Sequence, residues 1–259
     1  MSAFAELARF YDAVYGDKDY AAEAAYVARL LDRHGHNPRS VLELGSGTGR
    51  LAVELARGGM RVLGIDASSD MVELANGRQR QLSVEGISFL AADATRFRAE
   101  QRFDAVIACF HVLNYMASPQ ALAAAFATAA AHLAPGGLFL FDSWHGPAVR
   151  AQGPETRVRD LVVEDTPVVR IAEPHHDPVQ QTVDVRYRFF VQAPPAETWQ
   201  LIEETHHLRY LFREDIAAAC RDAGFELVCE EAWLSGALLD EQTWSACYLA
   251  KRVEGDDRP

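Results

Sequence analysis

A glycine-rich turn is the first feature of the sequence whose spacing could serve chemistry. In ELGSGTG, from Glu43 to Gly49, glycines at positions 45, 47 and 49 follow a short apolar run and precede a helical pattern. Glycine adopts positive φ at little cost and has no Cβ, so the backbone can bend sharply and approach a ligand closely. The spacing is GxGxG, followed by Arg50, whereas a dinucleotide fingerprint reads GxGxxG and rests a pyrophosphate on the helix N-terminus. The turn predicts a nucleoside-bearing cofactor without pyrophosphate; the alternative is a turn that needs glycines for its backbone alone.

Two aspartates stand where the next two strands end. Asp66 closes MRVLGID, where a carboxylate can accept hydrogen bonds from both hydroxyls of a ribose. A helix cap is the alternative for Asp66, but Ser68 and Ser69 already offer caps. Asp93 closes ISFLAAD and could bind an adenine amino group, or it could be a plain turn residue. Ligands of open α/β sheets bind beyond the carboxyl ends of the strands, so these features are expected to converge.

Histidines follow the later strands. His111 comes directly after FDAVIACF, and a neutral imidazole there could act as a base toward a reacting amine; the alternative is a histidine that packs or caps a turn. Trp144 and His145 follow GLFLFD and could line an acceptor pocket. The EPHHDP segment, with His175 and His176 between prolines, is interpreted as a turn rather than a metal site.

The segment ETHHLRYLF offers a further set of polar side chains. Side chains alternate between the two faces of a strand, so one of the two histidines, His206 or His207, can share a face with Arg209. An arginine there could clamp a phosphate with two parallel hydrogen bonds. The alternative for each of these residues alone is a solvated strand face.

Alternating strands and helices must position these residues. A capped amphipathic helix is predicted from Asp19 to Gly35, followed by apolar runs near 40–45, 60–66, 87–93, 103–110 and 137–142 with helical patterns between them. From about 150 to 211 the pattern alternates with period two and lacks helices. The sequence then returns to a helix, Arg213 to Ala223, and two closing strands.

This order predicts an α/β fold: a Rossmann-like, doubly wound, mostly parallel sheet with an antiparallel β insertion after the fifth strand. Residues 1–149 and 212–253 are expected to form the cofactor-binding domain, residues 150–211 an insertion that caps the substrate, and residues 254–259 a disordered tail.

Composition restricts the class of partner. The 259 residues are 49% apolar and 24% charged, with a formal net charge of -12. Scattered basic residues in an acidic chain argue against nucleic acid and favour a small-molecule substrate. The four cysteines lack the spacing of a zinc site, and no metal is expected. Neither an export signal nor a membrane-spanning run is found, so a cytoplasmic location is predicted.

Several motifs together resemble a known family. VLELGSGTGRL, the acid of GIDAS, LAADAT, FDAVIACFHVLNYM and HLAPGGLFLFD are similar to the successive motifs of class I S-adenosylmethionine-dependent methyltransferases. The opening FYDAVYGDKDYAAEA is similar to bacterial enzymes that N-methylate the amino group of nucleotide-linked aminodeoxysugars, and WHGPAVR and ETHHLRYLF match that group more loosely.

The resemblance implies S-adenosylmethionine as cofactor, S-adenosylhomocysteine as product, a nucleotide-sugar as acceptor and an N-terminal segment that folds over the cofactor. It implies His111 and Tyr15 as catalytic residues; the alternative for Tyr11 and Tyr15 is that they are core aromatics without a function. The cofactor-binding residues it implies are Tyr11, Tyr20, Glu43, Gly45, Ser46, Gly47, Gly49, Asp66, Ala67, Met71, Asp93, Ala94 and Phe110. Trp144, His145, His207 and Arg209 are the expected substrate-binding residues, and a homodimer is a further expectation.

Three other functions stay open on the sequence alone. One is another small-molecule O- or N-methyltransferase of natural-product biosynthesis. A second is a relative that binds the cofactor without turnover. A nicotinamide dehydrogenase is the third and is disfavoured by the glycine spacing.

Overall fold

The computed structural model describes residues 8–35, 37–163, 165–193 and 198–253. The elements of the first half are α1 (Ala8–Val14), α2 (Tyr20–Arg33), β1 (Ser40–Leu44), α3 (Arg50–Arg57), β2 (Arg61–Asp66), α4 (Ser69–Leu82), β3 (Ile87–Ala91), β4 (Phe103–Ala108), the 3-10 helix η1 (Val112–Tyr115) and α5 (Pro119–Ala131). Those of the second half are β5 (Leu133–Trp144), α6 (Gly146–Gln152), β6 (Arg157–Val163), β7 (Thr166–Asp177), β8 (Thr182–Ala193), β9 (Thr198–Arg209), α7 (Arg213–Asp222), β10 (Phe225–Ala232) and β11 (Ser245–Arg252).

Seven strands form the main sheet in the order β10-β11-β5-β4-β1-β2-β3. Six of them run in the same direction, and β11 is antiparallel to both of its neighbours, β5 and β10. From β1 the chain continues to β2 and β3 on one side of β1, and it then returns to form β4 on the other side. The direction of winding therefore reverses at β1. Ligands bind in the crevice at such a point. The predicted Rossmann-like, mostly parallel sheet is confirmed.

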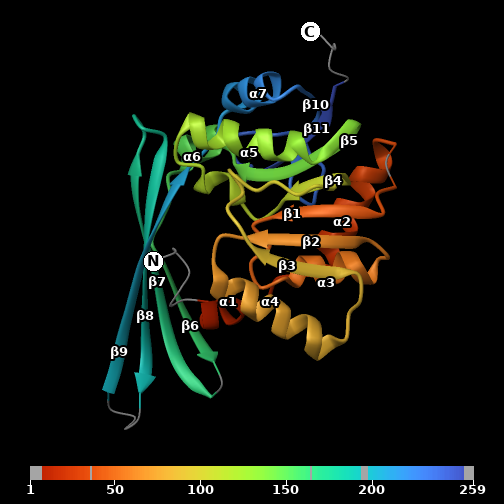
Figure 1. The fold of residues 1–259 in the computed structure, drawn as a ribbon. Helices are drawn as coiled ribbons and strands as arrows, with labels where there is room; N and C mark the ends of the chain where they lie inside the picture. Colours follow the sequence, from red (N-terminus) through yellow and green to blue (C-terminus); the bar gives the residue numbers. More distant parts are fainter. Residues whose placement is uncertain (1–7, 36, 164, 194–197, 254–259) are drawn as a thin grey trace.

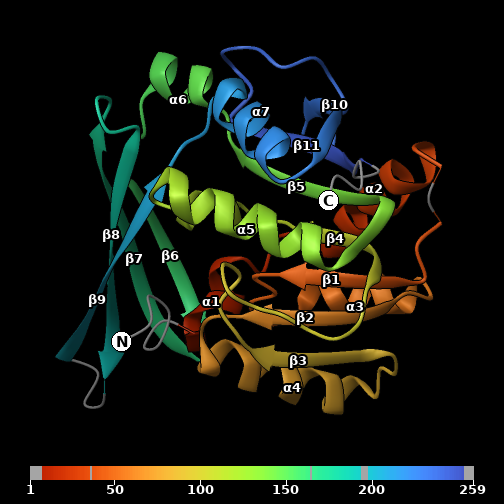
Figure 2. The same cartoon turned by 45° about the horizontal axis from the view of Figure 1, so that its top comes forward.

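Helices cover both faces of the main sheet (Figure 2). One apolar core joins α5 and α7 to one face through side chains such as Phe126, Phe139 and Ile216. The other core joins α2, α3 and α4 to the opposite face through Leu31, Leu55 and Ala75. The predicted caps form as well, since Asp19 accepts from the backbone N–H of Ala22 and Ser68 from that of Met71. None of the described helices is long and apolar enough to cross a membrane.

The insertion is a separate antiparallel sheet in the order β6-β7-β8-β9, here called the cap sheet. Figure 1 shows it standing on the side toward which the parallel strands point, with α1 between β6 and the main sheet. Its inner face, which carries Phe189 and Leu208, packs toward the rest of the molecule, and its outer face carries exposed residues such as Trp199. The division into domains at 149 and 212 stays a proposal.

Two details differ from the sequence prediction. EPHHDP is not a turn, because His175 and His176 continue β7 and pair with Asp184 and Val183 of β8; the turn follows at 178–181. Cross-strand pairing therefore continues past Pro174. The fifth strand is also longer than the predicted 137–142, since β5 runs from Leu133 to Trp144. The predicted disordered tail, 254–259, lies outside the described residues.

Candidate active site

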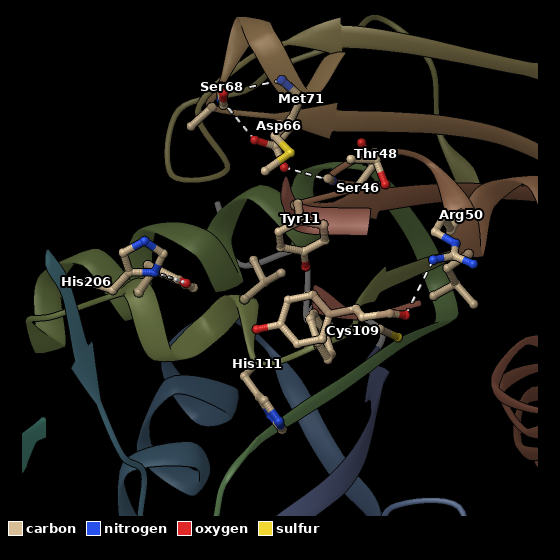
Figure 3. Close-up of a pocket in the computed structure, with 18 of the residues that line it drawn as sticks. Tyr11, Ser46, Thr48, Arg50, Asp66, Ser68, Met71, Cys109, His111 and His206 are labelled. Atoms are coloured by element: carbon tan, nitrogen blue, oxygen red, sulfur yellow. Dashed lines mark hydrogen bonds between the residues drawn. The ribbon is translucent and has the colours of Figure 1, made fainter. Parts of the chain in front are cut away.

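A pocket of about 390 Å³ lies between the carboxyl ends of the main sheet and the inner face of the cap sheet. Its walls come from α1, the glycine turn after β1, the ends of β2 and β4, η1, and strands β7 to β9. In Figure 3, Asp66 and Met71 lie at the top, Arg50 at the right, His206 at the left and His111 at the bottom. The pocket thus joins the predicted cofactor residues to side chains of the insertion.

The three glycines of the turn all have positive φ but meet different surroundings. A Cβ on Gly45 would come within 2.4 Å of Val112, and one on Gly49 within 2.6 Å of Phe89. A Cβ on Gly47 would find only Tyr11, at 4.0 Å. Gly45 and Gly49 are therefore needed for close packing. Gly47 is the glycine that leaves open space beside the pocket.

Asp66 is fixed by the turn that it faces. Its Oδ2 accepts from the backbone N–H of Gly47 at 2.8 Å, and its Oδ1 accepts from that of Ser68 at 2.9 Å. Burial raises the pKa of Asp66, against the lowering effect of the two N–H donors. Each carboxylate oxygen keeps a further lone pair, so the group can still accept from ligand hydroxyls.

Asp93 lines the same pocket but is exposed and bonded within its own turn. Its Oδ1 accepts from both the backbone N–H and the hydroxyl of Thr95, at 2.7 Å each. Burial raises the pKa of Asp93, but these bonds outweigh it and leave the pKa lowered. The turn interpretation of Asp93 thus has a geometric basis, and its role toward adenine stays a prediction. Ala67, Met71 and Ala94 line the pocket beside these two acids.

Helix α1 lies against the glycine turn through polar contacts. The Asp12 Oδ1 accepts from the Thr48 hydroxyl at 2.7 Å, and the Arg78 guanidinium contacts the other oxygen of the Asp12 carboxylate. Arg78 also donates through Nε to the carbonyl of Thr48 at 3.0 Å. Arg50 reaches the carbonyl of Tyr15 at 3.4 Å. These bonds join α1 to both the turn and α4.

The same helix packs against the cap sheet on its other side. Phe10 stacks on Phe189 with ring centroids 5.5 Å apart, and Val14 joins the same apolar cluster. Tyr11 and Tyr15 lie 4.8 Å apart, centroid to centroid, and line the pocket together with Tyr20. Burial raises the pKa of the Tyr15 phenol well above its ordinary value. The phenol of Tyr15 is therefore protonated at neutral pH and can donate a hydrogen bond.

Glu43 and Ser46 bring buried polar atoms to the pocket. Both residues line it, and neither the Glu43 Oε2 nor the Ser46 Oγ has a hydrogen-bond partner among the described residues. Burial, with a smaller contribution from the nearby Asp66, raises the pKa of Glu43 to about 8 against the lowering effect of Lys18. Buried polar atoms are costly without a partner, so these two indicate a place that a polar ligand completes.

His111 is held in an uncommon backbone conformation at the end of β4. Phe110 and His111 have φ of 72° and 63°, values that side-chain-bearing residues seldom adopt and that cluster at functional sites. The Asp142 Oδ1 accepts from the backbone N–H of His111 at 2.9 Å. The Asp142 Oδ2 lies 2.9 Å from the His111 Nδ1. Lys18 stands 3.3 Å above the centroid of the Phe110 ring.

Asp142 was not among the sequence predictions, although it is the last residue of the GLFLFD run that predicts the fifth strand. Burial alone raises its pKa, but the charge of His111 and the hydrogen bonds from its ring and backbone outweigh this, and the pKa is lowered. Asp142 is 1% exposed, so a buried carboxylate stands behind the histidine. It leaves Nε2 as the ring nitrogen of His111 that a substrate can meet.

The cap sheet contributes Arg170, Tyr187 and His206 to the pocket, none of which was a predicted site residue. The Tyr115 hydroxyl and the His206 Nδ1 lie 2.9 Å apart, and the rings of Tyr187 and His206 are 4.8 Å apart. The sequence contains a pattern that could have indicated them, because these residues alternate along their strands with residues that face outward. A prediction from this alternation also requires knowing which face of the sheet is covered, and the sequence does not show that.

Three of the four predicted substrate residues lie outside the pocket, and only Trp144 lines it. The His207 side chain points to the outer face of the cap sheet, where its Nδ1 lies 2.8 Å from Asp184, so its role toward a substrate stays a prediction without support from this pocket. Arg209 is buried at the end of β9, where it donates to Gln181 and Asp215. His145 precedes α6, with its Nδ1 3.2 Å from the carbonyl of Asp240.

The described residues contain no group of three or more His, Cys, Asp or Glu side chains that could hold a metal ion. The described cysteines are free thiols. The expectation that no metal is used stays a prediction.

Comparisons with known proteins agree with this geometry. Residues 41–137 match the family model described as a methyltransferase domain. Over 224 residues the chain is 28% identical to the dTDP-3-amino-3,6-dideoxy-alpha-D-glucopyranose N,N-dimethyltransferase of Streptomyces fradiae, a match that covers 86% of this chain and 84% of the relative.

Solved structures extend the likeness to more than nine tenths of the chain. An amino pentose methyltransferase from Micromonospora echinaspora, solved with S-adenosylmethionine bound, is 25% identical, with a TM-score of 0.73 over 94% of this chain and 96% of that one. A S-adenosylmethionine-dependent methyltransferase from Clostridium acetobutylicum is 20% identical with a TM-score of 0.79, over 95% and 96%, and shows the fold. The match includes the cap sheet, because either alignment spans more than nine tenths of the chain.

Proposed function

This chain is an S-adenosylmethionine-dependent methyltransferase, and we propose that its acceptor is the amino group of an aminodeoxysugar linked to a nucleotide. One observation carries the proposal: the pocket runs from the glycine turn to the inner face of the cap sheet, and His111 lines it. A single cavity thus contains both a nucleoside cradle and a separate polar surface for an acceptor. Two relatives whose names state aminosugar substrates support the proposal. The relative from Streptomyces fradiae matches the sequence over 86% of the chain, and the amino pentose enzyme shares the fold over 94% of it.

The residues of the nucleoside side fit the cofactor. Its ammonium group would complete the orphaned carboxylate oxygen of Glu43, and its ribose hydroxyls would meet the free lone pairs of Asp66. Gly47 leaves room for a ligand beside the backbone, and Met71 and Ala94 offer apolar contact to a flat base. When bound, the cofactor supplies an electrophilic methyl group on a positively charged sulfur.

The chain has two tasks toward the acceptor: to hold it in line with the methyl group and to keep its amine uncharged. Holding the reactants in near-attack geometry supplies much of the rate enhancement. A protonated amine has no lone pair, so we assign His111 Nε2 as the acceptor of its proton. The Asp142 carboxylate stabilises the imidazolium that results. Tyr15, whose phenol stays protonated, would donate a hydrogen bond to the acceptor.

The experiment is a matched panel of acceptors. The protein is incubated with S-adenosylmethionine and nucleotide-linked sugars that carry an amino group at C3 or C4, each beside its hydroxyl analogue. We expect mass gains of one or two methyl groups on the amines and none on the hydroxyl analogues. Methylation of a hydroxyl, phenol or carboxylate substrate with none of the amines would reject the proposal. Binding of S-adenosylhomocysteine without turnover of any acceptor would favour a non-catalytic relative.

Assembly and location are separate from this proposal. The homodimer and the cytoplasmic location expected from the sequence stay predictions. Gel filtration with light scattering tests the first.

A further inference from the structure

We propose that Arg170 is the anchor for a phosphate group of the acceptor, an inference that rests on the proposed nucleotide-linked substrate. Arg170 lies on β7, faces the pocket and is 8% exposed. Its guanidinium carbon stands 4.7 Å from the centroid of the Tyr187 ring. A neutral aromatic ring does not compensate the positive charge of Arg170.

The described residues place no carboxylate within ion-pair distance of Arg170. Burial of a charge without a counter-ion is expensive, and such groups in proteins are normally paired. An anionic group of a ligand would supply the missing charge. The guanidinium is planar and always protonated, which suits it to bidentate binding of phosphate.

The arginines on the two faces of the cap sheet differ in their ion pairing. On the outer face, Arg186 lies 2.7 Å from Glu203, and Arg188 lies 2.7 Å from Glu173. On the inner face, Arg159 of β6 stands directly opposite Arg170 in the strand register. Like charges at directly opposed positions destabilise a sheet. The outer face pairs its positive charges within the protein, whereas the inner face brings two together.

The charges around this pair are few. Arg157 follows on the same face, opposite Ala172, and adds a third positive charge. Arg159 donates to the carbonyl of Val14 and lies 3.6 Å from Asp17, whose side chain is 74% exposed, so this ion pair is weak. Glu204 is the acid nearest in the register. It stands opposite Tyr187 on β8, with Oε1 3.7 Å from the Nε2 of His206.

The phenols near Arg170 complete the proposed phosphate site. Tyr15 and Tyr187 line the pocket beside it, and burial raises the pKa of each, so both are neutral hydrogen-bond donors at physiological pH. One guanidinium and two hydroxyl groups match the several acceptor oxygens of a phosphate diester or diphosphate. A neutral acceptor would leave this surface without a counter-charge.

Binding of thymidine diphosphate to the full chain, with S-adenosylhomocysteine present, tests the site by calorimetry. We expect Arg170→Met to weaken the thymidine diphosphate complex at least tenfold and to leave the affinity for S-adenosylhomocysteine unchanged, which also reports an intact fold. Arg170→Lys should bind thymidine diphosphate with an affinity between those of wild type and Arg170→Met, because lysine keeps the charge but lacks the planar guanidinium. Arg186→Met, on the outer face of the same sheet, is the control and should bind as wild type. Equal binding by Arg170→Met and Arg186→Met would overturn the proposal, as would competition by succinate as strong as that by pyrophosphate.

A kinetic pair separates this inference from the proposed function. The same aminosugar is supplied as its nucleotide diphosphate and as a neutral methyl glycoside. Wild type should show the lower KM for the nucleotide form, and Arg170→Met should raise that KM at least tenfold with little change for the glycoside. Amine methylation with an unchanged KM in Arg170→Met would overturn the anchor and leave the proposed function standing. Loss of diphosphate binding in Arg170→Met, with no amine methylated by wild type, would reject the function and retain the anion site.

Discussion

The carboxylate of Asp142 meets His111 twice, once at the imidazole and once at the backbone. Oδ2 lies 2.9 Å from the ring Nδ1, while Oδ1 accepts from the backbone N–H at 2.9 Å. The hydrogen bond to the backbone holds His111 in its left-handed conformation, and the 2.9 Å contact with Nδ1 leaves Nε2 as the ring nitrogen that faces the pocket. Ring orientation and backbone strain thus depend on the same buried acid.

Replacement of this acid should therefore act through the histidine. We expect Asp142→Asn to lower kcat about tenfold or more, because the uncharged amide stabilises an imidazolium less well. The double variant His111→Asn/Asp142→Asn should be no slower than His111→Asn alone, because residues that act as a unit are not additive. Additive losses in kcat would show that Asp142 acts independently of His111. Ser245→Ala, which removes a hydroxyl 3.4 Å from Asp142 Oδ2, is the control.

His111 itself can be tested without loss of its backbone geometry. Asparagine tolerates the left-handed region better than most residues, so His111→Asn should fold and bind S-adenosylhomocysteine as wild type does. Its kcat should fall about ten- to a hundredfold, a modest loss for a base because proximity supplies much of the rate. His207→Asn, on the outer face of the cap sheet, is the matched control. Unchanged turnover in His111→Asn would assign the histidine to packing.

Glu43 should make stability depend on pH. Its folded-state pKa, about 8, lies above the ordinary value for glutamate, so its favourable contribution is complete below that ordinary value and is lost as the pH rises through 8. Over this window the unfolding free energy should fall by at most about 1.4 kcal/mol per pH unit through this group. Urea unfolding of the ligand-free protein between pH 5 and pH 9 measures the loss.

The matched variant for this measurement is Glu43→Gln, which should flatten that part of the pH dependence, while exposed Glu85→Gln should leave it intact. A ligand ammonium favours the ionised carboxylate, so S-adenosylhomocysteine should bind wild type more tightly as the pH rises from 6 toward 8. The Gln variant should lack this trend. Parallel pH profiles for wild type and Glu43→Gln would contradict the assignment.

Two glycines allow backbone strain to be separated from ligand contact. Gly47 and Gly59 both have positive φ, and a Cβ would meet no atom closer than 4.0 Å at either position. Gly47→Ala and Gly59→Ala should each lose about 1 to 2 kcal/mol of stability from the left-handed conformation. Only Gly47→Ala should weaken S-adenosylhomocysteine binding, because its methyl group enters the pocket. Calorimetry measures the affinity of both variants for S-adenosylhomocysteine. Equal affinities would show that the cofactor does not bind beside this turn.

The sheet and the nucleoside side of the site were predictable because each depends on local patterns. Asp66 and Gly47 are 19 positions apart, and the order of strands and helices brings the ends of β1 and β2 together. Asp142 was within reach of the same logic. Parallel neighbours β4 and β5 end at one edge, so the residue that ends the GLFLFD run was bound to lie near His111.

The acceptor side was less predictable because a strand pattern defines two faces without saying which is covered. In ETHHLRYLF, choosing His207 in place of His206 puts the side chain in solvent. Arg170 follows two valines in β7, and its role depends on which face of the sheet it occupies, which only tertiary packing determines. The pairing of Arg209 with Asp215 likewise depends on how β9 meets α7.

Helix α1 touches both halves of the molecule, with Asp12 against the glycine turn and Phe10 against the cap sheet. A cofactor that stabilises the position of α1 also stabilises the position of the cap sheet, against which the acceptor binds. If binding of the cofactor stabilises α1 in this way, the two affinities are thermodynamically linked, and each ligand strengthens the binding of the other by the same factor. Such coupling favours an ordered sequence of events, in which the sugar is retained chiefly by enzyme already charged with its methyl donor.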